Sequence, residues 1–151
     1  MKFKIVDRVL HIIYTQKDKK SNDFKNICQI SEIYEGVNTS SFIGFNFPMK
    51  IVPSNNSLYK YKKDADYVIV YKNGDKHTKM HELCHAKFYI NKEYKESVYS
   101  LWNSLTISSK KNIINMLLKM KYKNEREILI DEFQAYYYTE KSNFFGKVNF
   151  C

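Results

Sequence analysis

The stretch Met80-His81-Glu82-Leu83-Cys84-His85-Ala86 decides how the fold of this chain is interpreted. On a helix, His81 and His85 are one turn apart on the same face, so their ring nitrogens can converge on one metal ion at roughly 2.0 to 2.1 Å. Glu82 then lies beside the metal, where its carboxylate can take a proton from a metal-bound water molecule. The pattern therefore predicts a site for one zinc ion, with Glu82 as the general base.

An H-E-x-x-H also arises by chance on ordinary helices, so the flanking sequence has to support it. Upstream, the β-branched and aromatic run Tyr67-Val68-Ile69-Val70-Tyr71 predicts a strand, and Asn73-Gly74 predicts the turn that closes it. Asp75 is a suitable cap for a following helix that carries the motif and ends near Ile90. The context thus predicts a strand, a turn and the motif helix in that order.

This order of elements resembles the zincin metallopeptidases, over roughly residues 67 to 90. The resemblance implies a zinc hydrolase that cleaves peptide bonds through a zinc-bound water activated by Glu82. It also implies that residues 67 to 71 form an exposed edge strand, along which an extended peptide substrate aligns. The apolar run itself also permits a central strand whose backbone is already paired. Lys79 and Lys87 depart from the uncharged flanks usual in the family, but both can extend into solvent along a partly exposed helix.

A catalytic zinc usually has three protein ligands and one open position, so a third ligand is needed. His77 lies eight residues before His85, roughly 12 Å along a helix, and these two side chains cannot bind one ion together. His11, within a short apolar run, is expected to be a half-buried, hydrogen-bonded strand residue. Because no histidine follows His85, any ligand further along the chain must be a carboxylate.

Two acids interrupt an otherwise apolar segment at residues 128–138, where a buried carboxylate needs a partner. On a helix, Glu132 shares a face with the small residue Ala135, which permits close packing against the motif helix. This arrangement resembles the gluzincin branch of the zincins, whose third ligand is a glutamate on a later helix. The resemblance implies that Glu132 is the third ligand, with Asp131 as the alternative, and a structural role for both acids stays open.

Many gluzincins have an aspartate four residues after that glutamate, which orients a zinc histidine, and here Tyr136 occupies that place. The orienting group must then come from elsewhere, either Asp131 or a backbone carbonyl. Tyr136, Tyr137 and Tyr138 are candidate donors to the oxyanion of a tetrahedral intermediate. We expect aromatic packing for at least two of them and name Tyr136, with Glu82, as a candidate catalytic residue.

The length of 151 residues suits one core, and without repeats or a linker we expect a single zincin-like domain over residues 1–151. Segments near 3–14, with a turn at Asp7-Arg8, and at 42–52 look extended; residues 27–34 fit either a helix or a strand. Apolar residues at helical spacing predict a helix at 93–105, and a further helix is expected after Ser108, which is a suitable cap. The expected class is α+β, with a small N-terminal sheet, the motif helix and a C-terminal helix that carries the third ligand.

The net charge of +9 invites a nucleic-acid interpretation, which the composition weakens. Only Arg8 and Arg126 among the 25 basic residues are arginine, the residue that base and phosphate recognition usually recruits. No nucleic-acid-binding module is recognisable. We therefore expect a peptide or protein substrate; the alternative is a non-catalytic, zinc-stabilised binding protein that associates with nucleic acid.

The three cysteines Cys28, Cys84 and Cys151 are an odd number and include no C-x-x-C pair, so they do not suggest a framework of disulfide bonds. This favours a reducing compartment. No signal peptide or stretch resembling a membrane span is recognisable, so we expect a cytoplasmic protein without a membrane partner. The sequence carries no indication of oligomeric state.

Overall fold

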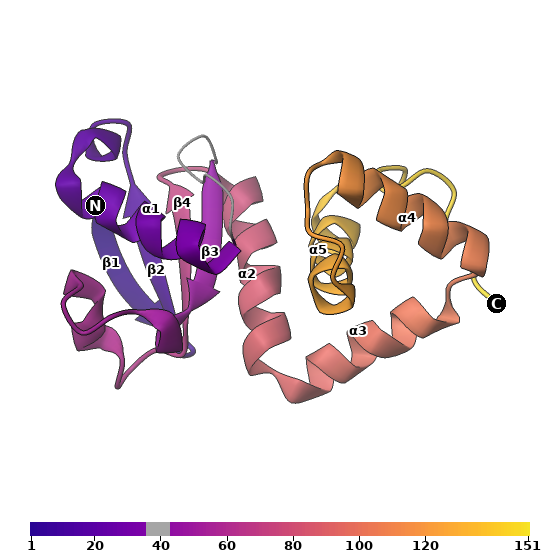
Figure 1. The fold of residues 1–151 in the computed structure, drawn as a ribbon, viewed down its shortest axis with the longest axis horizontal. Helices are drawn as coiled ribbons and strands as arrows, with labels where there is room; N and C mark the ends of the chain where they lie inside the picture. The colour runs from indigo at the N-terminus through magenta and orange to yellow at the C-terminus, as the bar shows by residue number, and fades with distance from the viewer. Residues whose placement is uncertain (36–42) are drawn as a thin grey trace. The chain divides into compact units, whose positions relative to one another are not determined.

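The computed structural model describes residues 1–35 and 43–151, so Phe42, at the start of the predicted extended segment, lies outside the described residues. The chain divides into two compact units, Met1–Ala86 and Lys87–Cys151, and the division falls inside helix α2 (Lys76–Ile90). A four-stranded sheet in the N-terminal part, with one helix between its second and third strands, is followed by helices, which confirms the expected α+β class (Figure 1). A single domain over residues 1–151 stays a prediction.

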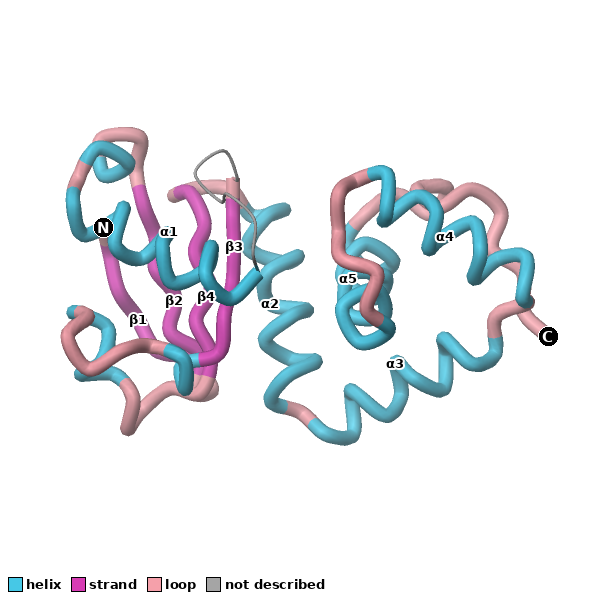
Figure 2. The backbone as a smooth tube through the Cα atoms, viewed as in Figure 1, coloured by secondary structure: helices cyan, strands magenta, loops and turns pink. Residues whose placement is uncertain are grey.

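The first unit is built on a four-stranded mixed sheet with the order β1-β2-β4-β3 (Figure 2). β1 and β2 form an antiparallel hairpin, β2 and β4 are parallel, and β3 is antiparallel to β4. Asp7 and Arg8 have φ angles of 49° and 63°, which confirms the predicted turn and suits the tight connection of a hairpin. The strands are β1 (Lys2–Val6), β2 (Val9–Tyr14), β3 (Gly44–Pro48) and β4 (Tyr67–Lys72).

Strand β4 lies inside the sheet, so the prediction that residues 67–71 form an exposed edge strand is wrong. Val68 pairs with Leu10 of β2 on one side and with Phe47 of β3 on the other. The backbone of β4 is therefore already paired and cannot add a peptide as a further strand. The continuous apolar run was the physical signal, because strands covered on both faces show such runs instead of an alternating pattern.

The two faces of the sheet are covered by different helices within the first unit. The ambiguous segment 27–34 is helical, because it belongs to helix α1 (Asn22–Glu35), which lies against the sheet (Figure 1). The buried residues of α1, including Phe24 and Ile27, pack against the inward side chains of β2 and β3. The opposite face, with Val9, Ile69 and Tyr71, packs against Leu83 and Ala86 of α2. The motif helix is thus fixed to the sheet by its apolar residues.

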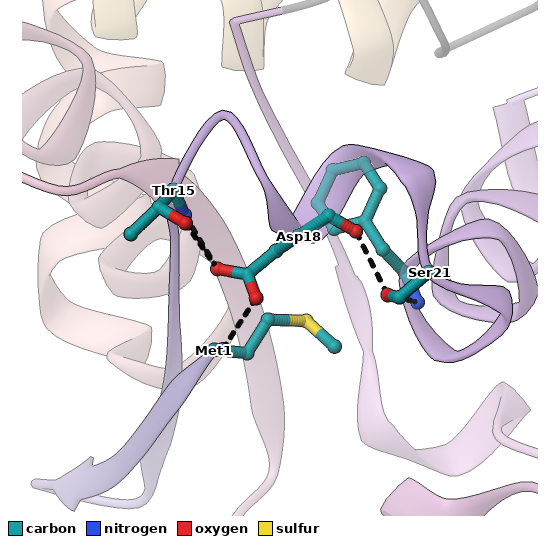
Figure 3. Close-up of polar contacts among 5 residues, drawn as sticks. Met1, Thr15, Asp18 and Ser21 are labelled. Atoms are coloured by element: carbon teal, nitrogen blue, oxygen red, sulfur yellow. Dashed lines mark hydrogen bonds and ion pairs between the residues drawn. The ribbon is translucent and has the colours of Figure 1, made fainter.

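Asp18 ties the beginning of β1 to the segment before α1 (Figure 3). Its Oδ1 accepts a 2.9 Å hydrogen bond from the amino group of Met1, and its Oδ2 accepts from the backbone and hydroxyl of Thr15. These hydrogen bonds lower the pKa of Asp18 to about 2. Ser21 then caps α1, because its hydroxyl accepts from the amide of Phe24. The segment between β2 and α1 is therefore held in place by side-chain hydrogen bonds.

In the described residues of the first unit, the connections contain three short 3₁₀ helices. Asn56 caps one of them by accepting from the amide of Leu58, whose side chain is fully buried in the core of this unit. The segment between β3 and β4 is thus held by packing as well as by its turns. The 3₁₀ helices are η1 (Asp18–Lys20), η2 (Met49–Ile51) and η3 (Ser57–Tyr61).

The second unit is helical, with α3 (Lys92–Ser104), α4 (Ile107–Lys119) and α5 (Arg126–Thr139) around an aromatic core that includes Trp102 and Phe133. Thr106 caps α4 by accepting from the amide of Ser109, so the predicted cap at Ser108 is wrong by two residues. Within the described part of the chain, no helix combines the length and apolarity that crossing a membrane requires.

Candidate metal centre

The motif helix begins at the predicted residue and places both histidines on one face. The carboxylate of Asp75 accepts hydrogen bonds from the amide and hydroxyl of Thr78, which confirms it as the cap of α2. One turn further along, the Nε2 atoms of His81 and His85 lie 3.2 Å apart. The predicted convergence of the two rings is therefore present within a single helix.

This separation suits two ligands of one tetrahedral zinc ion. Bonds of 2.0 to 2.1 Å at a tetrahedral angle put two zinc-bound nitrogens about 3.3 Å apart. The rings are tilted by 71° to one another, with centroids 5.0 Å apart, so both Nε2 atoms are directed to the same place without stacking. The donor atoms, imidazole nitrogens, are of the type that zinc prefers.

Burial keeps the imidazole of His81 in the neutral form that binds metals. Its pKa is lowered from the ordinary 6.5 to about 3, mainly by burial and further by the neighbouring His85 and His77. His85 is itself almost fully buried. His77, at the first turn of α2, is exposed and lies outside the pair, as the eight-residue separation predicted.

Glu82 is buried and held by neighbours on the sheet. Its Oε2 accepts a 2.7 Å hydrogen bond from Nδ2 of Asn46, whose Oδ1 in turn accepts from the hydroxyl of Tyr67 at 2.6 Å. A Cβ atom placed on Gly44 would lie 2.8 Å from Oε1 of Glu82, so the backbone of β3 approaches this carboxylate closely. The predicted general base therefore has one defined position beside the histidine pair on α2.

Glu132 lies on α5 among aromatic side chains of the second unit. Ala135, one turn further on, is fully buried, as expected for a small residue at a closely packed position. The hydroxyls of Tyr122 and Tyr136 lie 2.7 Å apart. Burial raises the pKa of Tyr122 above its ordinary value, and the neighbouring Glu132 carboxylate, which shares a hydrogen bond with Tyr122, raises it further.

The neighbouring acid Asp131 has a different environment. Its Oδ1 accepts a 3.0 Å hydrogen bond from Nε2 of Gln134, and the carbonyl oxygen of that amide accepts from the hydroxyl of Tyr94. Asp131 is thus part of a network between α3 and α5. These contacts are those of a structural carboxylate, whereas Glu132 shares a hydrogen bond with Tyr122.

Tyr136 combines a packing role with its hydroxyl contact. Its ring stacks on Phe144 with centroids 4.8 Å apart and planes 5° apart, and it meets Phe145 edge-on. Aromatic packing, one of the roles expected for the tyrosine run, is therefore present at this residue. Its part in stabilising an oxyanion stays a prediction.

Taken together, His81, His85 and Glu132 supply a His/His/Glu donor set that could hold one metal ion. His11 is not part of it. That histidine is buried on β2, where its Nδ1 lies 3.0 Å from the hydroxyl of Tyr71, which confirms the hydrogen-bonded strand residue expected from the sequence.

Sequence reasoning missed the residues that hold the two carboxylates. Asn46 lies 36 positions before Glu82, and no local pattern connects them. The sequence predicts Tyr67 only as a strand residue, and no motif distinguishes Tyr122. The one available signal was Asn46 itself, a polar side chain between Phe45 and Phe47 in an apolar segment, where burial would demand a partner.

Comparison with known proteins adds no further constraint: no protein-family model matches the chain, and neither a curated protein nor a solved structure is significantly similar to it.

Proposed function

We propose that this protein is a zinc-dependent metallopeptidase that hydrolyses peptide bonds. One observation carries the proposal: His81 and His85, one turn apart on α2, bring two imidazole nitrogens to 3.2 Å from each other, and the residue next to His81 is Glu82, whose carboxylate is buried and hydrogen-bonded. A site that only stores or senses zinc needs its ligands but has no use for a carboxylate held next to them.

In this proposal His81, His85 and Glu132 hold one zinc ion, which leaves the fourth position for water or substrate. When bound, zinc would polarise the peptide carbonyl and lower the pKa of a water molecule to near 7. The donor set fits this role, because it contains two neutral imidazoles and one carboxylate, the combination found in many catalytic zinc sites.

Glu82 is the general base and then the general acid. Its carboxylate takes a proton from the attacking water while the water oxygen forms a bond to the peptide carbon. As the bond between that carbon and the amide nitrogen breaks, Glu82 passes the proton to the nitrogen, and an amine leaves. The hydrogen bond from Asn46 supports this role, because it holds the buried carboxylate of Glu82 in one position.

Tyr136 is the proposed donor to the oxyanion of the tetrahedral intermediate. Its phenolic hydroxyl suits the task chemically, and its position 2.7 Å from the hydroxyl of Tyr122, the tyrosine that shares a hydrogen bond with Glu132, supports the proposal. The substrate is a peptide or protein. It does not bind by adding to β4, because both edges of that strand are paired.

The decisive experiment compares the wild-type protein with Glu82→Gln on a broad peptide library, with the zinc content measured in both. We expect cleavage by the wild type, and loss of cleavage with zinc retained in the variant. Glu93→Gln, which changes an exposed acid at the start of α3, is the control and should cleave normally.

A zinc-loaded wild type that cleaves no member of the library would overturn the proposal. If the same protein also bound nucleic acid, and unfolded when zinc was removed, the non-catalytic binding protein would replace it. The strongly basic composition makes that second assay worth including.

A further inference from the structure

Three buried polar side chains form a line of hydrogen bonds that ends on Glu82. The hydroxyl of Tyr67 on β4 donates to Oδ1 of Asn46 on β3 at 2.6 Å, and Nδ2 of Asn46 donates to Oε2 of Glu82 at 2.7 Å. The three side chains are exposed by only 3, 9 and 5%, respectively. Polar groups buried to this degree need partners, and these three supply one another with them.

The donors and acceptors of these three side chains fix the direction of each hydrogen bond. The hydroxyl of Tyr67 donates to the amide oxygen of Asn46, so the NH₂ group of Asn46 has to face Glu82. An ionised carboxylate can only accept hydrogen bonds, and it forms stronger ones than a neutral acceptor. Asn46 therefore suits Glu82 in the ionised form in which a general base begins its work.

Strand β3 confines the other carboxylate oxygen as well. Gly44 lies two residues before Asn46, so both positions are on the same face of the strand. A Cβ atom at Gly44 would lie 2.8 Å from Oε1 of Glu82 and 3.0 Å from the carbonyl oxygen of Val70. One oxygen is thus held by the Asn46 amide, and the other fits against backbone that has no side chain.

We propose that Asn46 is a positioning residue that fixes the general base Glu82, and that Tyr67 in turn fixes the orientation of the Asn46 amide. This inference rests on the proposed peptidase function, and it assigns neither residue a contact with substrate. Both residues act through Glu82, so they determine the fraction of time that its carboxylate is in the orientation needed for proton transfer.

The kinetic test separates turnover from substrate binding. Because general acid–base catalysis contributes roughly 10²- to 10⁴-fold, a misplaced base should lose part of that factor. We expect Asn46→Ala to lower kcat by about ten- to a hundredfold, with KM and zinc content unchanged. Tyr67→Phe, which removes only the hydroxyl, should lower kcat by a smaller factor.

Tyr71→Phe is the matched control, because it removes a hydroxyl from the same strand and the same face of the sheet. The hydroxyl of Tyr71 contacts His11 and not Asn46, so this variant should keep the wild-type kcat. A purely structural effect of losing a buried hydroxyl would instead lower the activity of both tyrosine variants alike. Tyr67→Phe retains the ring and its packing, which keeps the test available if Asn46→Ala does not fold.

A second measurement does not depend on catalysis. In the ¹⁵N-labelled protein, the side-chain amide protons of Asn46 should exchange slowly with solvent. Their resonances should move in Glu82→Ala but not in Glu93→Ala. Tyr67→Phe should accelerate their exchange, because it frees the amide to rotate.

The outcomes distinguish failure of the positioning role of Asn46 from failure of the peptidase proposal. Slow exchange together with the selective loss of kcat supports the positioning role. An Asn46 amide that is insensitive to Glu82→Ala, or an Asn46→Ala variant with unchanged kcat, overturns it while leaving the peptidase proposal in place. A wild type that cleaves nothing overturns the peptidase proposal and the positioning role with it, and the exchange data then report only a structural contact.

Discussion

The Nε2 atoms of His81 and His85 lie 3.2 Å apart on successive turns of α2. Two nitrogens bound to one tetrahedral zinc ion lie at about this separation. The geometry of α2 therefore sets the distance between these two candidate donor atoms.

The first prediction concerns metal content. We expect the purified protein to bind one zinc ion, and His85→Ala and Glu132→Ala each to lower zinc affinity markedly, because each removes a ligand. Asp131→Ala is the matched control, since it removes the neighbouring carboxylate, which accepts from Gln134. Elemental analysis and competition with a chelator measure the effect. Loss of zinc from Asp131→Ala, with zinc retained by Glu132→Ala, would show that Asp131 is the third ligand instead of Glu132.

The local parts of the site could be predicted from the sequence, because their spacing is set by a single helix. Asp75 as the cap, the end of the helix at Ile90 and the shared face of His81 and His85 all follow from helical geometry. The same holds for the turn at residues 7–8, where the hairpin has only two connecting residues.

The contacts between distant segments could not be predicted, because the sequence of a strand does not specify which other strands it pairs with. The run at residues 67–71 has the composition of a buried strand, yet the resemblance to the zincins suggested an edge, and the pairing with β2 and β3 decided against it. Asn46 and Glu82 come together only through the antiparallel register of β3 and β4 and the packing of α2. Segment 27–34 became helical because it covers the sheet, which outweighs its β-branched residues.

The second prediction concerns Gly44. An alanine there would place its methyl group against the side chains of Thr78 and Glu82 and against the backbone of β4. We expect Gly44→Ala to cost about 1–3 kcal/mol of unfolding free energy, the usual range for overpacking, and to lower peptidase activity by displacing Glu82. Urea denaturation and peptide cleavage measure the two effects.

A second substitution identifies the cause. Thr78→Ser removes the methyl group nearest to the new side chain but keeps the hydroxyl that donates to Asp75. In the Gly44→Ala background it should restore part of the lost stability and less of the activity, because the contact with Glu82 remains. If Thr78→Ser brought no recovery, the packing explanation would be wrong.

The third prediction concerns Tyr122, which shares hydrogen bonds with Tyr136 and Glu132. Tyr122→Phe leaves the aromatic ring in place but removes the group that orients the proposed carboxylate ligand. We expect zinc affinity to fall by about ten- to a hundredfold, as is typical when a ligand loses its orienting partner. Chelator competition measures this change, with Tyr137→Phe, an exposed neighbour on α5, as the control. Equal zinc affinities in the two variants would show that Tyr122 does not orient the Glu132 carboxylate.

The last prediction concerns the dependence of stability on pH, through His11. Burial, assisted by the nearby charges of Lys4 and Lys79, lowers the pKa of this histidine from 6.5 to about 4 in the folded protein. The unfolded chain therefore takes up a proton first as the pH falls, so His11 makes the folded state progressively less stable between pH 6.5 and about 4. Below that range both states are protonated and the effect stops growing.

We expect the urea midpoint of the metal-free protein to fall between pH 7 and pH 5, and to fall less steeply in His11→Gln. Tyr71→Phe, which keeps the buried imidazole, should retain the wild-type slope. An NMR titration of the His11 ring should give a midpoint near 4; a midpoint near 6.5, or an unchanged slope in His11→Gln, would contradict the assignment.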